Sequence, residues 1–322
     1  MASSAGATQS PMVAHHLRSL GAGSDPSPPS PQKIFNEIIH KIPTIQKFTE
    51  IIYEHISPSD GALICQSLAA SKQVERRNIR INFNAFTETL RIRIMPTELH
   101  DAHQRWAIDA LVEWTHGGLV SLEEQRNLDA GVGTTFDGFT GVYQSSHKEP
   151  DFVFRADTDD FPSIVIESSW SESFPYLQAD KDLWFKGNNS VQLVILLKWS
   201  KISGGRVKGS AEIWRRDGTG NLVATEMIIF PVPDLPVLNE RIEFTKGQLF
   251  GTAAIRRQEA DTLLHLRMSR LREIAEERLL KKMGLNRVKN CPFAISQIFG
   301  ALFRSPPGNL PSSAHRVDLT SN

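Results

Sequence analysis

The sequence predicts a mixed α/β domain in which strands and helices do not alternate regularly. Apolar residues recur at helical spacing over 33–56 and 97–116. Residues 79–94 alternate between apolar and polar side chains, and residues 151–167 contain two short apolar runs around a turn, as strands do. Because helices, a hairpin, a helix, a second hairpin, a helix and further strands follow one another, we expect a mixed sandwich rather than a doubly wound sheet.

Composition narrows the class of protein. The chain has 322 residues, enough to bury the core of one or two domains. Its formal net charge of zero argues against a protein that coats nucleic acid without specificity. Cys65 and Cys291 lie far apart and outside metal-ligand spacing, which favours an intracellular protein of the cytoplasm or nucleus. No apolar run reaches the ~20 residues of a bilayer span, so no membrane partner is expected.

Five segments follow from the pattern along the chain. The first is rich in serine and proline and poor in acids, and the last contains the run RSPPGNLPSS. Residues 251–290 hold ten Lys and Arg against five Asp and Glu, with apolar residues at helical spacing. The predicted order is a disordered leader at 1–32, a helical extension at 33–75, a core at 76–250, a basic amphipathic helix at 251–288 and a disordered tail at 289–322.

The core begins with a predicted hairpin and a helix. The stretches NIRINFNAF and ETLRIRIMP each alternate and predict two strands with one solvated face apiece. The stretch TELHDAHQRWAIDALVEWTHGG predicts a helix that Thr97 caps and that ends at Gly117 and Gly118. Later in the chain, VQLVILLKW predicts a buried strand, and SAEIWRR and ATEMIIFP predict two more around the turn DGTGN.

Two carboxylates stand out in the second hairpin, which PDFVF and SIVIE form around the turn RADTDDFP. A symmetric hairpin centred on Asp159 places Asp151 opposite Glu167, with Cβ atoms ~5 Å apart. Two ionised carboxylates that close repel each other, and burial increases the cost. A Mg²⁺ or Mn²⁺ ion would remove that repulsion and activate a water molecule. The alternative is an ordinary hairpin with a solvated carboxylate at each open end. The opposite face carries Phe152, Phe154, Ile164 and Ile166.

The following helix places a lysine among apolar residues. Ser173 is the expected N-cap, Pro175 lies in the first turn and Gly187 ends the helix. Leu177, Lys181 and Trp184 share the face that packs on the sheet. Lys181 therefore either extends its amine to solvent past apolar surface or pairs with a carboxylate inside.

These residues together resemble the PD-(D/E)XK nuclease superfamily, whose fold is restriction-endonuclease-like. Pro150-Asp151 matches the Pro-Asp of the family motif, and Glu167 matches the acid of its acid-x-Lys half. The closer resemblance is to uncharacterised fungal proteins with this domain, and a bacterial group of proteins that resemble restriction endonucleases is more distant. The matching blocks are Met95–His100, Ser146–Phe152 and Glu167–Trp184, within about residues 76 to 215.

The resemblance implies a mixed β-sheet flanked by helices and a Mg²⁺-dependent (or Mn²⁺-dependent) endonuclease that hydrolyses phosphodiesters of DNA or RNA. It assigns Asp151 and Glu167 to the metal and to catalysis. Ser169 stands where the family has its motif lysine, and in related subfamilies that lysine has moved to the next helix, where Lys181 is the candidate. A third acid of the family on the first core helix would be Glu98, Asp101 or Glu113, and His100 is a further polar candidate.

The same residues allow other interpretations. The runner-up is the same fold without catalysis, kept as a binding or protein-interaction module, and a third option is a phosphohydrolase that is not a nuclease. Trp170 would either stack on a base or close the core. Lys148 would either contact phosphate or be a solvated surface lysine. The basic C-terminal helix would follow a nucleic-acid backbone, pack on the sandwich or pair with a second copy of the chain.

Overall fold

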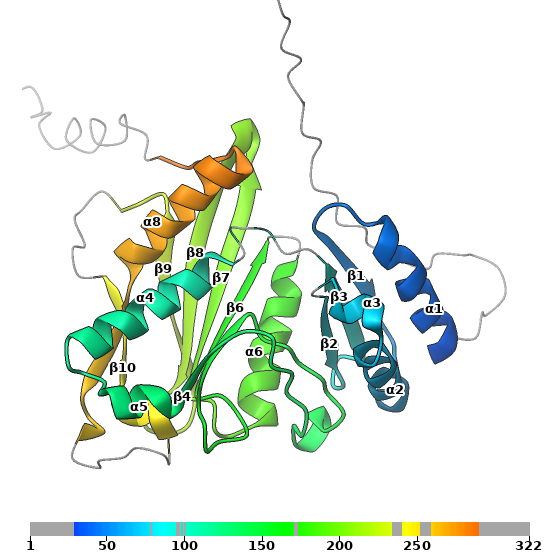
Figure 1. Cartoon of the computed structure of the whole chain (residues 1–322), viewed down its shortest axis with the longest axis horizontal. Coiled ribbons are helices and arrows are strands. Elements are labelled where there is room, and N and C mark those ends of the chain that lie inside the picture. The colour runs from blue at the N-terminus through cyan, green and yellow to red at the C-terminus, as the bar shows by residue number, and fades with distance from the viewer. Residues whose placement is uncertain are drawn as a thin grey trace, which may run out of the picture. The chain divides into compact units, whose positions relative to one another are not determined.

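The structure, a computed structural model, describes residues 29–77, 79–94, 97, 99, 101–170, 173–233, 240–251 and 259–289. Residues 1–28 of the predicted leader and 290–322 of the predicted tail lie outside these ranges. The fold is mixed α/β, with antiparallel and mixed sheets flanked by helices (Figure 1). In the described part of the chain, no helix combines the length and the apolar composition that a bilayer crossing requires.

The first part of the chain forms a three-stranded antiparallel sheet. In it, β3 (Thr89–Ile94) lies between β1 (Thr49–Tyr53) and β2 (Arg80–Asn84), so the predicted hairpin is confirmed. The purely helical extension expected at 33–75 is wrong at β1, because this β-branched and aromatic stretch completes the free edge of β3. The helices here are α1 (Pro31–Lys41), α2 (Pro58–Ala69) and α3 (Lys72–Glu75), and the turn η1 (Ile42–Thr44) contains Pro43.

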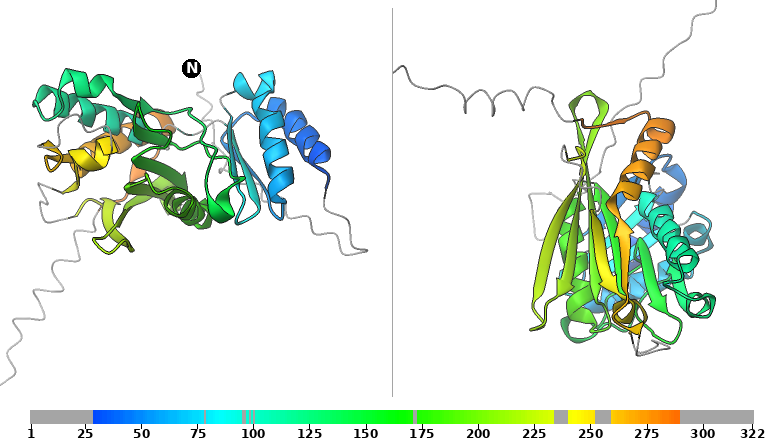
Figure 2. Two further views of the ribbon diagram at one scale, coloured as in Figure 1. Left: turned by 90° about the horizontal axis from the view of Figure 1, so that it is seen from below. Right: turned by 90° about the vertical axis from the view of Figure 1, so that its left-hand side faces the viewer.

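Both faces of this small sheet are buried. On one face Ile81, Phe83 and Ile92 pack with the helices α1 and α2, which lie on the outer side of the sheet (Figure 2). The other face carries the polar half of the alternation, and we expected it to be solvated. It is buried instead, because it lies against the carboxylates of the core. Its buried polar residues are Glu50, Arg80, Asn82, Asn84, Thr89, Arg91 and Arg93.

A seven-stranded mixed sheet forms the centre of the core. Its strand order is β12-β8-β7-β6-β5-β4, and β9 also pairs with β8. The pair β6–β7 is parallel, whereas β5–β6, β7–β8 and β8–β9 are antiparallel. The strands are β4 (Leu128–Gly131), β5 (Phe152–Ala156), β6 (Ile164–Trp170), β7 (Leu193–Ile202), β8 (Arg206–Arg216), β9 (Leu222–Phe230) and β12 (Asn286–Arg287).

Helices cover the two faces of this sheet. On one face α4 (Ala102–His116) packs through Trp106 and Trp114 on Phe154 and Ile164. On the other face α6 (Phe174–Gly187) packs on alternate residues of the same strands (Figure 1). The connections contain α5 (Leu122–Arg126) and the turns η2 (Gly141–Tyr143) and η4 (Ser203–Gly205).

The last described part of the chain corrects the prediction of one long basic helix. A strand pair comes first, β10 (Arg241–Thr245) with β11 (Leu263–Arg267), and α7 (Lys246–Phe250) follows β10. The helical part is α8 (Met268–Arg278), which continues into the π-helix η7 (Leu279–Met283). In β11, Leu264 and Leu266 are buried at period two, which the helical spacing of later residues concealed.

The basic residues of this part pair with acids of the same chain. Arg270 binds Asp109 of α4 at 2.7 Å, and Arg272 pairs with Glu240. The apolar residues of α8 lie in the core with those of α4. Of the alternatives given for this helix, packing on the sandwich is therefore the one that the structure has, and the apolar face of α8 is used within the chain.

Candidate functional site

The register of the β5–β6 hairpin brings the two predicted carboxylates to the same end of the sheet. Phe152 pairs with Ile166 and Phe154 with Ile164, so Asp151, one residue before β5, continues the ladder opposite Glu167. The register and the division of faces that the sequence predicted are confirmed. Asp151 and Glu167 are not solvated ends, however, because both residues are 0 % exposed.

Asp151 is surrounded by donors. Its Oδ1 accepts hydrogen bonds from Arg80 and, at 3.1 Å, from Arg93 Nη1. Its Oδ2 accepts from the backbone N–H of Ser168 at 2.7 Å, and Arg93 Nη1 lies 3.2 Å away. His103 Nε2 of α4 is 3.1 Å from the backbone oxygen of Asp151. The carboxylate is thus fixed from two sides by arginines of the small sheet and by the neighbouring strand β6.

Glu167 is less completely paired. Its Oε1 accepts a hydrogen bond from Trp184 Nε1 at 2.9 Å and lies 3.0 Å from Lys148 Nζ. Within the described part of the chain, its Oε2 accepts no hydrogen bond, and Arg93 Nη2 is 3.8 Å away. Burial raises the pKa of Glu167 to about 7, and the charge of Asp151 adds to this, although Lys148 and Arg93 oppose it.

Lys148 is the lysine that the structure brings to Glu167. Its ammonium lies 3.0 Å from Glu167 Oε1 and 2.9 Å from Asp180 Oδ2. These contacts are ion pairs by distance, but their angles are not those of hydrogen bonds. Two backbone hydrogen bonds to Phe136 hold the residue in place. The residue is 0 % exposed, so of the two alternatives given for Lys148 the solvated surface lysine is wrong.

Lys181 lies elsewhere. Its ammonium pairs with Asp182 at 2.8 Å and sits 4.1 Å from the ring centroid of Trp214. Trp214 belongs to β8 and is opposite Val194 of β7, which is opposite Val165 of β6. Because neighbouring strands are ~4.8 Å apart, two strand spacings separate β8 from the strand of Glu167. The amine therefore pairs with a carboxylate, but with the half-buried Asp182 of its own helix and not with Asp151 or Glu167, and it also packs over an aromatic ring.

Asp151 and Glu167 belong to a larger carboxylate cluster that the sequence did not predict. Arg91 joins Glu50 at 2.8 Å to Asp180 at 3.0 Å, and Asp180 in turn contacts Lys148. Burial would raise the pKa of Glu50, but Arg91 and Arg93 lower it to about 2. In full, the carboxylate cluster comprises Glu50, Asp151, Glu167 and Asp180 with Arg80, Arg91, Arg93 and Lys148. Four positive and four negative side chains therefore neutralise one another in the interior.

The other predicted candidates lie around the cluster or away from it. Asp101 Oδ1 is 3.9 Å from Arg80 Nη2. Glu113 pairs with Arg267 at the surface and is not part of the site. Glu98 and His100 are outside the described residues, within which no group of three or more His, Cys, Asp or Glu is arranged to hold a metal ion. Trp170 is buried in the core, as one of its two readings expected.

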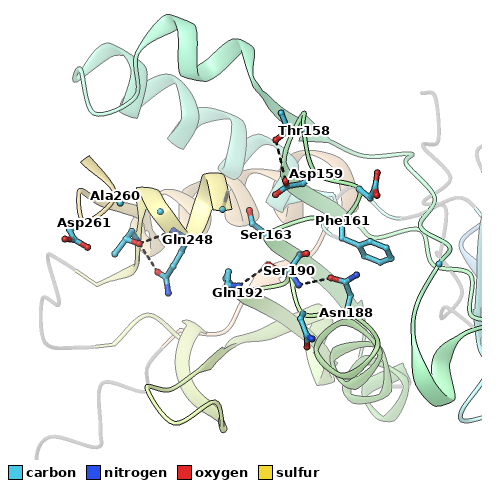
Figure 3. A pocket seen from close by; sticks show the side chains of 16 residues that line it. Thr158, Asp159, Phe161, Ser163, Asn188, Ser190, Gln192, Gln248, Ala260 and Asp261 are labelled. Atoms are coloured by element: carbon cyan, nitrogen blue, oxygen red, sulfur yellow. Dashed lines mark hydrogen bonds between the residues drawn. The ribbon is translucent and has the colours of Figure 1, made fainter. Parts of the chain in front are cut away.

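Two hollows lie near the ends of the β5–β6 hairpin. The side groove, of about 800 Å³, runs along α3, β2 and the start of α4. Its titratable lining residues are Glu75, Arg77, Arg80, Asp101, His147 and Glu149. The turn pocket, of about 910 Å³, lies at the other end of the hairpin (Figure 3). Its lining includes Asp159, Asp160, Asn188, Gln192, Gln248 and Asp261.

Comparison with protein-family models finds no match for the chain, and searches of curated proteins and of solved structures find none either.

Proposed function

We propose that the chain is a nuclease-like phosphodiester hydrolase with a restriction-endonuclease-like core, acting on DNA or RNA. One observation carries the proposal: carboxylates from adjacent strands meet at one end of a mixed sheet, with the Lys148 ammonium 3.0 Å from Glu167. The resemblance to the PD-(D/E)XK superfamily calls for an acid of a Pro-Asp pair and a second acid on adjacent strands. Asp151 and Glu167 meet that requirement.

In this proposal Lys148 takes the role that the sequence suggested for Lys181. A cationic amine beside the metal-binding acid would orient a water molecule or offset negative charge that develops on the phosphate. Lys148 has the required contact with Glu167, and Ser169 supplies no cation. Lys181 is engaged by Asp182 and Trp214 instead.

The donor set fits a divalent cation only in exchange for an arginine. The carboxylates of Asp151 and Glu167 are ligands that Mg²⁺ and Mn²⁺ accept. Within the described residues, the buried Oε2 of Glu167 accepts no hydrogen bond. Arg93 contacts both carboxylates and already supplies the positive charge between them. Once bound, such an ion would supply water activation and charge neutralisation. The chain's own residues would hold Asp151 through the N–H of Ser168 and Glu167 through Trp184.

A second candidate function has its own support. Asp151 and Glu167 are completely buried, and the internal arginines neutralise them without a metal. This arrangement is what a catalytically inactive binding or protein-interaction module would retain, with the acids serving as an ionic clamp between the small sheet and the core.

Two measurements separate these functions. Titration calorimetry with Mn²⁺ should give a binding isotherm for the wild type that Asp151→Asn abolishes. A plasmid-nicking assay should then show activity that Glu167→Gln and Lys148→Met remove and that Lys181→Met, the matched lysine control, retains. If the wild type neither binds Mn²⁺ nor nicks DNA or RNA, the inactive module replaces the hydrolase. If Lys181→Met is as inactive as Lys148→Met, the assignment of the lysine fails.

A further inference from the structure

The two edges of the seven-stranded sheet differ in how they are protected. At one edge, β4 is only four residues long, and its Asp129 pairs with Arg155 of β5. At the other edge, β8 is paired with the short β12 and with β9, which is nine residues long. β9 contains no proline and no basic residue, and Glu226 is its only charged side chain. Because short strands, prolines and charges are what protect a sheet edge, β9 is the less protected of the two.

The outer side of β9 lacks a partner strand within the part of the chain that the structure describes. There, β9 pairs with β8 alone, and no backbone–backbone hydrogen bond from outside this pair reaches Val223–Met227. Arg272 of α8 donates to the carbonyl oxygens of Ile228 and Ile229, so the unpaired edge ends at these residues. Val223 and Ile228 are each 41 % exposed. The edge thus combines unpaired backbone groups with exposed apolar side chains, which favours the addition of another strand.

The sequence of β9 is nearly symmetrical about Thr225, and this symmetry selects the partner. In an antiparallel pair of identical strands, a two-fold axis at Thr225 sets apolar residues opposite apolar residues and separates the two glutamates. The resulting pairs are Leu222–Ile228, Val223–Met227, Ala224–Glu226 and Thr225–Thr225. The neighbouring symmetric registers fit less well. An axis at Ala224 sets Leu222 opposite Glu226, and an axis at Glu226 sets two like charges opposite each other, which is repulsive.

We propose that β9 is the self-association edge of the chain: two copies pair antiparallel through β9 with Thr225 on the two-fold axis, and their sheets become continuous. A two-fold pairing uses the β9 edge of both copies, so association ends at the dimer instead of continuing into a filament. The exposed side chains of Val223 and Ile228 gain apolar neighbours from the second copy. The inference does not depend on the proposed hydrolase function, because β9 contributes no residue to the carboxylate cluster.

Sedimentation velocity of the full-length protein over a series of concentrations measures the association. Thr225→Lys sets two ammonium groups opposite each other on the axis and should raise the dissociation constant of the dimer by about tenfold or more. Ala224→Lys, the matched control one residue away, sets the same charge opposite Glu226 of the second copy. It should leave the dissociation constant unchanged or lower it by up to about fivefold. A mixture of Thr225→Lys and Thr225→Glu chains should form the dimer again, because opposite charges then meet on the axis.

Three outcomes would overturn this inference without touching the proposed hydrolase. The wild type could stay a monomer at every concentration. The dimer could be insensitive to Thr225→Lys, which would mean that it forms through another surface. Finally, Ala224→Lys could weaken the dimer as much as Thr225→Lys, which would contradict the register. Thr225 and Ala224 are both exposed, so these variants should fold. If Thr225→Lys does not, Thr225→Glu alone tests the same like-charge repulsion.

Discussion

The β5–β6 hairpin carries carboxylates at both ends, but their surroundings differ. At the open end, Asp151 and Glu167 are completely buried and meet arginines from a separate sheet. At the turn, Asp160 is exposed and lines a pocket of mostly uncharged polar side chains (Figure 3). The same two strands thus support a dry, neutralised cluster and a solvated polar pocket. What decides between them is whether another part of the chain brings cations, because a buried carboxylate without them is too costly.

The largest loss of folding stability is expected from Asp151→Ala, at the buried end of the β5–β6 hairpin. This change leaves Arg80 and Arg93 buried without the carboxylate that both of them contact, which should lower the free energy of unfolding by about 3–5 kcal/mol. Urea denaturation monitored by tryptophan fluorescence measures it. A loss below about 1 kcal/mol, the range of exposed ion pairs, would show that the cluster is open to water.

The next largest loss of folding stability is expected from Lys148→Met. The change keeps the apolar stem but leaves Glu167 and Asp180 facing each other without their shared cation, so we expect a loss of about 2–3 kcal/mol at pH 8. Lys181→Met removes an ammonium over Trp214 and should cost about 1 kcal/mol. Equal losses in the two variants would contradict the difference between these lysines.

The pH dependence of stability should have opposite signs at two acids of the cluster. The pKa of Glu167 is raised from 4.5 to about 7, so the folded state holds this proton more tightly and stability falls as pH rises from about 4.5 to 7. The pKa of Glu50 is lowered from 4.5 to about 2, so stability falls as pH decreases from about 4.5 to 2. Each shift corresponds to roughly 3 kcal/mol at most.

Urea denaturation from pH 3 to pH 8 checks this prediction. In Glu167→Gln, the loss of stability between about pH 4.5 and 7 should be smaller than in the wild type. In Glu50→Gln, the loss of stability below about pH 4.5 should be smaller. If Glu167→Gln leaves the neutral side unchanged, Glu167 keeps an ordinary pKa and its environment is not the dry one described.

The sequence predicted the part of the site that a single hairpin forms. It did not predict the part that residues distant in the sequence contribute. The turn and two apolar runs were enough to set the register of Asp151 and Glu167, because a hairpin is a local structure. The alternation of Arg80, Asn82 and Arg91 looks the same whether that face meets water or a carboxylate cluster. Nothing in a single sequence shows that the small sheet lies on the core, so the alternation predicts a solvated face for its arginines.

Two other features were not predicted from the sequence for the same reason. The position of Lys148 is set by one bridge to Phe136, a contact between loop segments that no periodicity reports. In β11, Leu264 stands four residues before Met268, a spacing that fits a helix as well as the strand that pairs with β10. Short elements with distant partners are the ones that local patterns describe least well.

A moderate loss of folding stability is expected when a hydrogen bond that anchors the turn end of the hairpin is removed. Ser163 is buried, and its hydroxyl donates to the backbone oxygen of Leu249 in α7 at 2.6 Å. Ser163→Ala should therefore cost about 1 kcal/mol, since it leaves that oxygen without its donor. Ser190→Ala, at an exposed position of the same pocket, is the control and should stay within about 0.5 kcal/mol. Similar values for both variants would mean that the anchor has no energetic weight.

The smallest effect is expected from Asp160→Asn, the counterpart of Asp151→Asn at the other end of the same strands. Asp160 is exposed in the turn pocket, so loss of its charge should change the free energy of unfolding by less than about 0.5 kcal/mol. Added salt should shrink even this difference, because water and ions screen the carboxylate. A loss comparable to that of Asp151→Ala would mean that the turn end holds a charge cluster too, and exposure would then no longer explain why the two ends differ.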